Sequence, residues 1–311
     1  MLCIRNRQAA RAGRYALVFV GALLALLGSA CAAASRSANP GAPRANEPAY
    51  PVILTASEDR RKRALDAWAS LTTGQGIVGA PAPELQFVTE TLRALPSQLG
   101  APLRLPELGG SANDGAIGDL TEEETRESLR RFIASAAPLL GVDTQDISLI
   151  KITNGTDGAR RALYRQRPFD YPLRNGYGVI EVTFAPNRRV LGLSSTAIHD
   201  TERVARALAA VRPQQLTADK VTGSLVGRDI SYNDADGRTQ TATITSNVSD
   251  IKARELVVYP VQFADGAGTL ALHLAWEIAV SGSTPPLLVY VDAVSGVILA
   301  ATPAQDKEAA T

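Results

Sequence analysis

The sequence predicts an α+β fold of two small modules, each with a helix packed on an antiparallel β-sheet. Two segments with apolar residues at helical spacing begin at the capping residues Thr121 and Thr217. Runs that alternate apolar and polar residues follow, as in strands with one buried face. Residues with turn chemistry separate these runs, so each module is a helix followed by an antiparallel meander.

The prediction divides the chain into six parts. They are a signal peptide (1–30), a flexible tether (31–50), a first helix with a short apolar segment and a loop (51–118), a first α+β module (119–203), a second α+β module (204–303) and a polar tail (304–311).

The N-terminus has the charge pattern of an export signal. Four arginines and no acid precede an uncharged stretch over residues 15–34; they are Arg5, Arg7, Arg11 and Arg14. Their removal from the formal net charge of +1 leaves −3 on the exported chain. Such a nearly neutral body argues against a nucleic-acid surface, which needs a concentrated basic face.

Cys31 follows Leu27-Gly28-Ser29-Ala30, a run that resembles a bacterial lipobox. The resemblance implies that the Cys31 thiol is lipidated after cleavage, which would anchor the exported protein to the bacterial cell membrane or outer membrane. Stable attachment needs two or more acyl chains. Two alternatives stay open: an uncleaved helical anchor, since about 20 apolar residues span a bilayer, and ordinary signal-peptidase cleavage near Ala30.

Cysteine usage limits the chemistry of the exported body. Cys3 lies in the signal and Cys31 is the only other cysteine. The body therefore has no internal disulfide and no thiolate for a metal or for catalysis. Residues 32–48 are rich in Ala, Ser, Asn and Pro, which indicates a flexible tether.

Two helices are expected in the first half of the chain. Ser57 caps the first, and its apolar face holds Ala64, Leu65, Trp68 and Leu71. Residues 85–95 are compatible with a strand or a helix, and residues 96–118 have loop composition.

The second helix starts at a capping box formed by Thr121 and Glu124. Pro138 is expected to end or kink it, and Gly141 is a further stop. Its apolar face holds Leu129, Phe132, Ile133 and Ala136.

Strands of the first module are expected at residues 147–152, 162–167, 178–184 and 189–196. In the third strand Gly178, Ile180, Val182 and Phe184 share one face. Between the third and the fourth, Ala185-Pro186-Asn187-Arg188 has turn chemistry, because proline presets φ and asparagine tolerates the left-handed region.

The second module is expected to hold a helix at residues 217–225 and strands at 230–232, 239–246, 256–260, 270–280, 287–293 and 297–300. The clearest alternation predicts a core stripe of Leu270, Leu272, Leu274, Trp276, Ile278 and Val280.

The two histidines do not form a zinc-peptidase motif, which needs two histidines four residues apart on a helix. His199 is expected at a strand end beside Asp200, where solvent covers it. His273 is expected on the less apolar face of its strand. Neither is assigned a catalytic or metal-binding role.

Two carboxylates, Glu277 and Asp292, would be needed for a glycosidase, but both have structural explanations. Asp292 precedes a tight turn, where a carboxylate commonly accepts backbone amides. Glu277 is expected on a partly exposed sheet face.

Other candidate sites are also explained without chemistry. Asp234 and Asp236 begin like a calcium loop, but Thr239 and Thr245 occupy the positions of the required glycine and glutamate, which favours a hairpin. Ser194 lacks the second glycine of a nucleophile elbow. No catalytic residue, metal or cofactor is predicted.

Motifs in both halves resemble a known family. Residues 87–196 resemble the fungalysin/thermolysin propeptide module through Tyr164-Arg165-Gln166, Phe169-Asp170-Tyr171-Pro172-Leu173 and the 178–193 hairpin. Residues 217–300 resemble a PepSY module through Leu256-Val257-Val258-Tyr259-Pro260, Leu274-Ala275-Trp276-Glu277-Ile278, and Val289-Tyr290-Val291-Asp292-Ala293 with Gly296. Asn187 stands where the family often has Asp-Gly, and no peptidase is fused to these modules.

The resemblance implies a non-catalytic, membrane-tethered protein that assists the folding of a secreted zinc metallopeptidase, or inhibits it, in trans. In that family such modules act as folding assistants and inhibitors without catalytic residues of their own. The alternative is a cell-envelope interaction scaffold unrelated to peptidases. A protein partner is expected, and nucleic acid is not.

Overall fold

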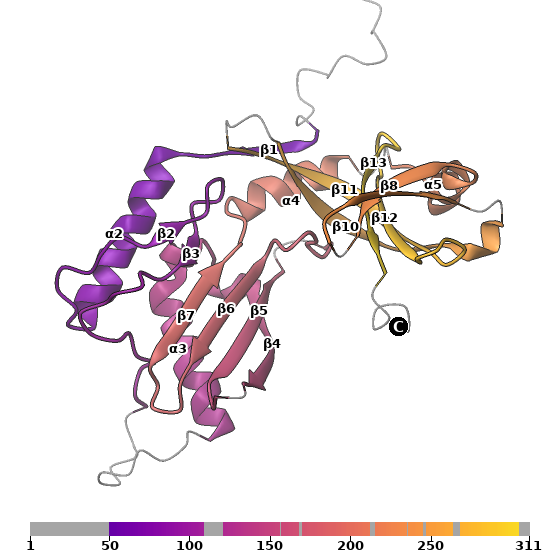
Figure 1. The fold of residues 1–311 in the computed structure, drawn as a ribbon. Helices are drawn as coiled ribbons and strands as arrows, with labels where there is room; N and C mark the ends of the chain where they lie inside the picture. Colours follow the sequence, from indigo (N-terminus) through magenta and orange to yellow (C-terminus); the bar gives the residue numbers. More distant parts are fainter. Residues whose placement is uncertain are drawn as a thin grey trace, which may run out of the picture. The chain divides into compact units, whose positions relative to one another are not determined.

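The computed structural model describes residues 50–108, 121–155, 157–167, 170–211, 215–234, 236–244, 247–263 and 268–304 (Figure 1). The predicted signal peptide, Cys31, the tether before Tyr50, Phe169 and most of the polar tail lie outside them. No helix in this part of the chain is long and apolar enough to cross a bilayer. The fold is α+β, as predicted, with helices packed on antiparallel sheets.

The first sheet has four antiparallel strands in the order β4-β5-β6-β7. Their bounds are Ile147–Asn154, Arg160–Gln166, Val179–Phe184 and Val190–Ser195. Helix α3 (Glu122–Leu140) covers one face of this sheet (Figure 1). The predicted faces are confirmed, because the apolar side chains of β6 and α3 are buried against each other.

The capping box of α3 is confirmed. Of the two outcomes expected at Pro138, an end or a kink, the end is wrong. Thr121 Oγ1 accepts from the amide of Glu124 at 3.2 Å, and Glu124 Oε2 accepts from the amide of Thr121 at 2.9 Å. The helix continues through Pro138 to Leu140, because a proline in the last turn removes only one intrahelical bond. Gly141, at φ 69°, makes the stop.

Helix α2 (Glu58–Gly74) begins at the predicted cap, where Ser57 Oγ accepts from the amide of Arg60 at 3.4 Å. Trp68 is buried in the core shared with α3, and its indole N–H donates to the carbonyl of Pro81 at 2.9 Å. Ala64 and Leu71 are also buried.

The segment that periodicity left open forms two short strands, β2 (Glu84–Leu85) and β3 (Leu92–Ala94). Glu90 lies in the loop between them at φ 55° and is buried. Thr91 Oγ1 donates to the carbonyl of Ser195 at 2.9 Å, which ties this loop to β7.

The predicted turn is present between β6 and β7, where Arg188 donates its amide to the carbonyl of Ala185 at 3.0 Å. Arg188, at φ 63°, is the left-handed residue of this turn. Asn187 accepts the amide of Arg189 through its side-chain oxygen at 3.2 Å, a common local role of asparagine in turns.

The second sheet is built around a long central strand, β11 (Thr269–Val280). Strand β10 (Ile251–Gln262) pairs along one edge of it. The other edge has two partners: β1 (Val52–Thr55) pairs with Thr269–Leu272, and β12 (Leu287–Asp292) pairs with Ala275–Val280. Strand β13 (Ile298–Pro303) completes the sheet beside β12.

The predicted core stripe on β11 is confirmed. Its leucines, Ile278 and Val280 are at most 1% exposed, and Trp276 is half-buried. Two helices supply the opposing apolar residues: α5 (Ala218–Leu225), which was predicted, and α4 (Thr201–Ala210), which was not. Helix α4 follows Asp200, whose side chain makes no capping hydrogen bond.

The opposite face of the second sheet is also buried. Val257, Tyr259, Ala275, Leu288 and Tyr290 form an apolar cluster there, and the rings of the two tyrosines lie 4.4 Å apart.

The predicted hairpin at Asp234 is present between β8 (Asp229–Asn233) and β9 (Thr239–Thr243). Asp234 Oδ1 accepts the amides of Asp236 and Arg238 at 3.0 and 2.9 Å. The Asp234 carboxylate therefore makes its hydrogen bonds within its own hairpin.

Candidate functional site

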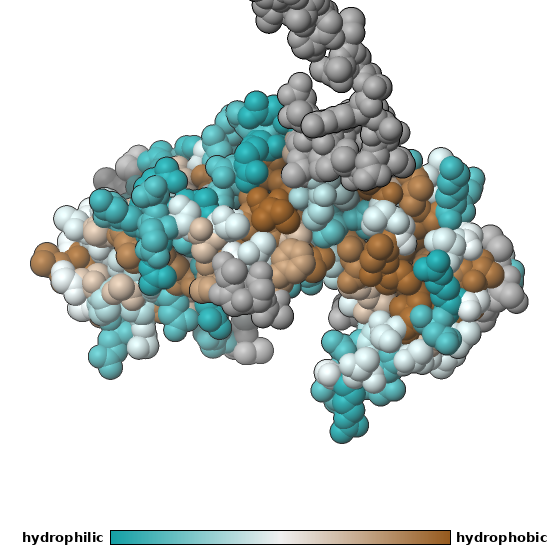
Figure 2. Space-filling view, turned by 90° about the horizontal axis from the view of Figure 1, so that it is seen from above, coloured by the Kyte–Doolittle hydropathy of each residue, from teal (hydrophilic) through white to brown (hydrophobic). Residues whose placement is uncertain are grey.

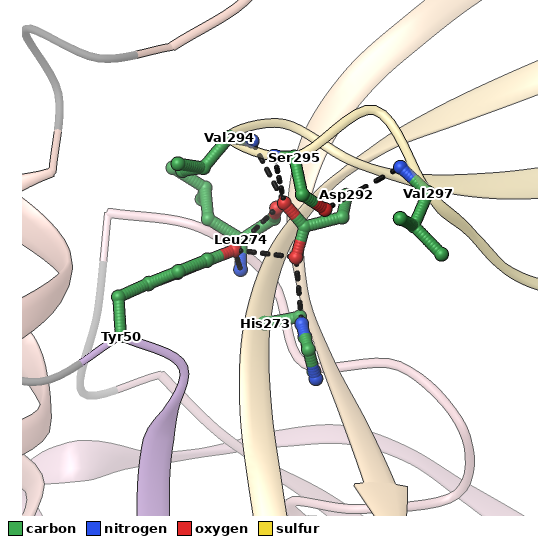
Figure 3. A network of polar contacts seen from close by, with 7 residues as sticks. All are labelled: Tyr50, His273, Leu274, Asp292, Val294, Ser295 and Val297. Carbon is green, nitrogen blue, oxygen red and sulfur yellow. Dashed lines mark hydrogen bonds and ion pairs between the residues drawn. The ribbon is translucent and has the colours of Figure 1, made fainter. Parts of the chain in front are cut away.

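The structure brings together two of the residues that the sequence singled out, His273 and Asp292. Ala275 of β11 pairs with Asp292 of β12, and His273 lies two residues along β11 on the same face. The distance from His273 Nδ1 to Asp292 Oδ2 is 2.6 Å (Figure 3). The carboxylate therefore fixes the orientation of the imidazole.

A third side chain, Tyr50, reaches the same carboxylate from the other end of the chain. Its hydroxyl donates to Asp292 Oδ2 at 2.8 Å and accepts the amide of Leu274 at 3.0 Å (Figure 3). Leu274 lies where β1 has ended and β12 has not begun on that edge of β11. The tyrosine thus satisfies a backbone amide that neither strand pairs.

The other carboxylate oxygen organises the turn after β12, as predicted. Asp292 Oδ1 accepts the amides of Val294 and Ser295 at 2.8 and 2.7 Å (Figure 3). Gly296, at φ 73°, donates its amide to the carbonyl of Asp292 at 2.9 Å. We call Tyr50, His273, Leu274, Asp292, Val294 and Ser295 the Asp292 cluster.

Asp292 is charged in this cluster although its side chain is only 2% exposed. Burial favours the neutral acid, but hydrogen bonds from His273, from the amides of Ser295 and Val294 and from Tyr50 outweigh it and hold the pKa of Asp292 below its ordinary value. Burial and the adjacent carboxylate raise the pKa of Tyr50 far above its ordinary value. Tyr50 therefore stays a neutral donor.

A histidine oriented by an aspartate is also part of nucleophilic catalysis, where the imidazole activates a hydroxyl or thiol. Over the described residues no hydrogen bond joins His273 to a serine, threonine or cysteine. The cluster instead joins β1, β11 and the turn after β12, which is a structural arrangement.

Glu277 lies in a second polar cluster, and the expectation that it is partly exposed is wrong. Its side chain is 3% exposed. Glu277 Oε2 pairs with Arg174 Nε at 2.6 Å, and its Oε1 lies 3.5 Å from Arg254 Nη1. Arg174 reaches it from a segment that runs beside β10, where its amide donates to the carbonyl of Val258 at 3.0 Å.

His199 was expected to be solvated, and this is also wrong. Neither ring nitrogen is accessible or has a hydrogen-bond partner. Burial, with a smaller contribution from Arg60, lowers the pKa of His199 to about 4. Arg60 itself pairs with the buried carboxylate of Glu90 at 3.3 Å. At neutral pH His199 is therefore an uncharged side chain packed beside a buried ion pair.

The Tyr164-Arg165-Gln166 motif also has a structural role. The buried side chain of Gln166 makes two hydrogen bonds to the backbone of Ile198. Its Nε2 donates to the carbonyl at 2.7 Å, and its Oε1 accepts from the backbone amide at 2.8 Å. It thereby fixes the segment that follows β7.

The described residues contain no group of three or more His, Cys, Asp or Glu side chains placed to hold a metal ion. Sequence reasoning identified His273, Asp292 and Glu277 but missed Tyr50, Arg174 and Arg254. Tyr50 fell at the end of the predicted tether, and no local pattern marks it. Arg174 directly follows the motif Phe169-Asp170-Tyr171-Pro172-Leu173, and this position was the one sequence feature that could have identified it.

Comparisons with known proteins include a similarity to a solved structure. The sequence matches no protein-family model and no curated protein. Among solved structures, the C-terminal domain of Bacillus megaterium YpeB aligns with 81% of this chain and 100% of its own, at 9% sequence identity and a TM-score of 0.31. A similarity of that size does not transfer a function to this chain.

Proposed function

We propose that this protein is a non-catalytic, membrane-tethered binding protein that assists the folding of a secreted zinc metallopeptidase, or inhibits it, in trans. One observation carries the proposal: the carboxylates that were candidates for a catalytic or metal-binding role make hydrogen bonds and ion pairs within the protein. Asp292 holds a turn and a strand junction, Glu277 is paired with two arginines, and Asp234 caps a hairpin.

Surfaces for a macromolecular partner support this proposal. One face of the first sheet faces α3, while the side chains on its other face are only half-buried, among them Leu163, Val179 and Thr183. Large apolar side chains also reach solvent, including Phe87 at 62% and Phe263 at 45% exposure. The face drawn in Figure 2 likewise mixes apolar and polar areas.

The metallopeptidase partner follows from the motif resemblance. Tyr164-Arg165-Gln166 and the Asp292 segment resemble the pro-segments that fold and restrain such enzymes, and both have structural roles in this chain. Attachment through a lipid on Cys31 would hold the protein where an exported enzyme emerges. The support for this tether is the lipobox-like sequence that ends at Cys31.

The test uses the full chain, purified in mild detergent, and secreted zinc metallopeptidases of the same organism that lack their own pro-segment. We expect a change in the rate of substrate hydrolysis or in the yield of active enzyme after refolding, with a stable complex. Unchanged rate and yield, with no complex, would refute the proposal.

A different outcome would support the alternative function. Crosslinking in cells that joins the protein to an envelope component, with no effect on any peptidase, would favour an interaction scaffold.

A further inference from the structure

Strand β4 is the open edge of the first sheet. It ends the strand order, whereas the opposite edge strand, β7, is covered because Val190 donates its amide to the carbonyl of Leu103 at 2.8 Å and Arg188 accepts the amide of Leu105 at 2.9 Å. The outer edge of β10 in the second sheet is likewise occupied by residues 172–174. An open edge eight residues long can pair with an added strand.

The register shows which backbone groups of β4 point outward. Arg167 donates its amide to the carbonyl of Asp146 at 2.6 Å. The backbone groups of Asp146 therefore point to β5. In an antiparallel pair every second residue points to the same neighbour, so the backbone groups of Ser148, which pairs with Arg165, also point to β5. The amides and carbonyls of Ile147 and Leu149 therefore point away from β5, toward an incoming strand.

A groove runs between this edge and α3. Its volume is about 550 Å³, and its lining includes Ile147, Leu149 and Ile152 of β4 with Ile133 of α3. All three β4 side chains are half-exposed. The groove thus offers apolar contacts to alternate side chains of a strand laid along β4.

Ile150 is the bulged residue of β4, between Leu149 and Lys151 in the pairing with β5, and its side chain is 42% exposed. A second hollow, also about 550 Å³, is lined by Ile150, Arg165 and Arg167, and Ile150 also lines the groove beside α3. The two hollows therefore adjoin at the bulge.

The charges on β4 and β5 have one sign, while the groove is also lined by Glu122, Arg126 and Arg130 and the second hollow by Asp170 and Glu255. Strands β4 and β5 contain Lys151, Arg160, Arg161 and Arg165 and no acid. Glu181 pairs with Arg161, and Arg160 turns inward to donate to Thr125 at 3.0 Å. Lys151 and Arg165 remain exposed on the face away from α3.

A second copy of the chain does not fit this edge. In an edge-to-edge dimer the Lys151 side chains would lie on adjoining strands and repel each other. A strand with acidic side chains avoids this repulsion.

We propose that β4 binds an extended, acidic segment of a partner protein as a fifth strand, with apolar side chains in the groove beside α3 and acidic side chains near Lys151 and Arg165. This site rests on the proposed function in that it supplies the contact surface for the partner.

The test uses three fluorescent ten-residue peptides and the full chain in mild detergent. The first alternates valine and glutamate, the second alternates valine and lysine, and the third is the first with alternate backbone amides methylated. We expect the first to bind at least about tenfold more tightly than the other two, since only it has both the charge and a free backbone edge. Hydrogen exchange should slow at Ile147 and Leu149 on binding.

Variants assign the binding to this edge. Lys151→Glu with Arg165→Glu should weaken binding of the acidic peptide by about tenfold or more. Arg61→Glu with Lys62→Glu makes the same charge change on the exposed surface of α2 and should leave it unchanged. Equal binding of all three peptides, equal loss in both double variants, or protection away from β4 would each overturn the proposal.

The same variants separate this proposal from the proposed function. If the wild-type protein affects a metallopeptidase and the β4 variant does so equally, the edge is not the contact surface and this proposal falls alone. If the wild-type protein affects no metallopeptidase, the proposed function falls, and the peptide measurements still decide the edge.

Discussion

The hydroxyl of Tyr50 lies 2.8 Å from the carboxylate of Asp292, although the two residues are 242 positions apart in the sequence. This bond joins the start of the described chain to the last turn of the second sheet. It lies at the point where the edge of β11 changes partner from β1 to β12. Residues near the start and near the end of the described part of the chain therefore contribute to one sheet.

The Tyr50→Phe variant should be less stable, because the buried amide of Leu274 loses its acceptor and Asp292 loses a donor. We expect a loss of about 1–3 kcal/mol in the free energy of unfolding, the usual cost of an unsatisfied buried polar group. Hydrogen exchange should quicken in β1. Tyr177→Phe removes the hydroxyl of another half-buried tyrosine and serves as the control. Equal stability of the two variants would contradict this role for Tyr50.

The Asp292→Asn variant should lose about 2–3 kcal/mol at neutral pH, because several hydrogen bonds to a charged acceptor are weakened. The pKa of Asp292 is below its ordinary value, so this stabilisation is present above the unfolded pKa of about 3.9 and is lost as pH falls through the folded value. The difference between wild type and variant in denaturant titrations should therefore shrink in acid.

Asp234→Asn is the matched control for Asp292. Asp234 also accepts turn amides, but in an exposed hairpin. We expect a smaller loss for it. A larger loss at Asp234 than at Asp292 would show that turn formation alone, and not the strand junction, explains the cluster.

His199 should make the protein sensitive to mild acid. Its pKa is about 4 in the folded protein and about 6.5 in the unfolded chain, so the unfolded state binds the additional proton between these values. Stability should be full above pH 6.5 and should fall as pH drops toward 4. The His199→Leu variant should lose most of this slope. An unchanged slope in His199→Leu would show that other groups cause the acid sensitivity.

Local patterns predicted the elements that local interactions determine. The capping box at Thr121 needs only Glu124, and the alternation along β11 needs only one apolar face. Asp292 was assigned to a turn because its partners, Val294 and Ser295, are its neighbours in sequence.

Long-range contacts were not predictable in the same way. Strand β1 has four residues, too few to show a period, and exists because β11 has a free edge there. His273 and Asp292 lie on predicted strands, but their proximity depends on the register between β11 and β12. His199 has a polar neighbour in sequence, which indicated a solvated position. It is buried because segments distant in sequence, including the one with Arg60, pack around it, and this burial lowers its pKa.

Replacement of Cys31 by alanine should release the protein from membranes if Cys31 carries the lipid. Fractionation of cells, with metabolic labelling by a fatty acid, measures this directly. Firm membrane retention of an uncleaved, unlabelled Cys31→Ala protein would instead favour a helical anchor formed by the apolar N-terminal stretch. Release of both wild type and variant would favour ordinary signal-peptidase cleavage.

Arg174 allows a comparison of a buried and an exposed carboxylate on the same guanidinium. It pairs with Glu277, whose side chain is 3% exposed, and with Glu255, which is 49% exposed. Removing one partner of a buried pair leaves an uncompensated charge and typically costs about 3–5 kcal/mol, whereas an exposed pair contributes about 0–1 kcal/mol.

Glu277→Gln should therefore destabilise the protein far more than Glu255→Gln in the same denaturant titration. The loss at Glu277 falls below the full range because Arg174 itself is 22% exposed and can be solvated. A hydrophobic replacement of both partners, Glu277→Leu with Arg174→Leu, should recover part of the loss, since no buried charge remains. If Glu277→Gln and Glu255→Gln were equally mild, the buried ion pair would not stabilise this sheet. Glu277 would then become the first residue to test for a role in binding.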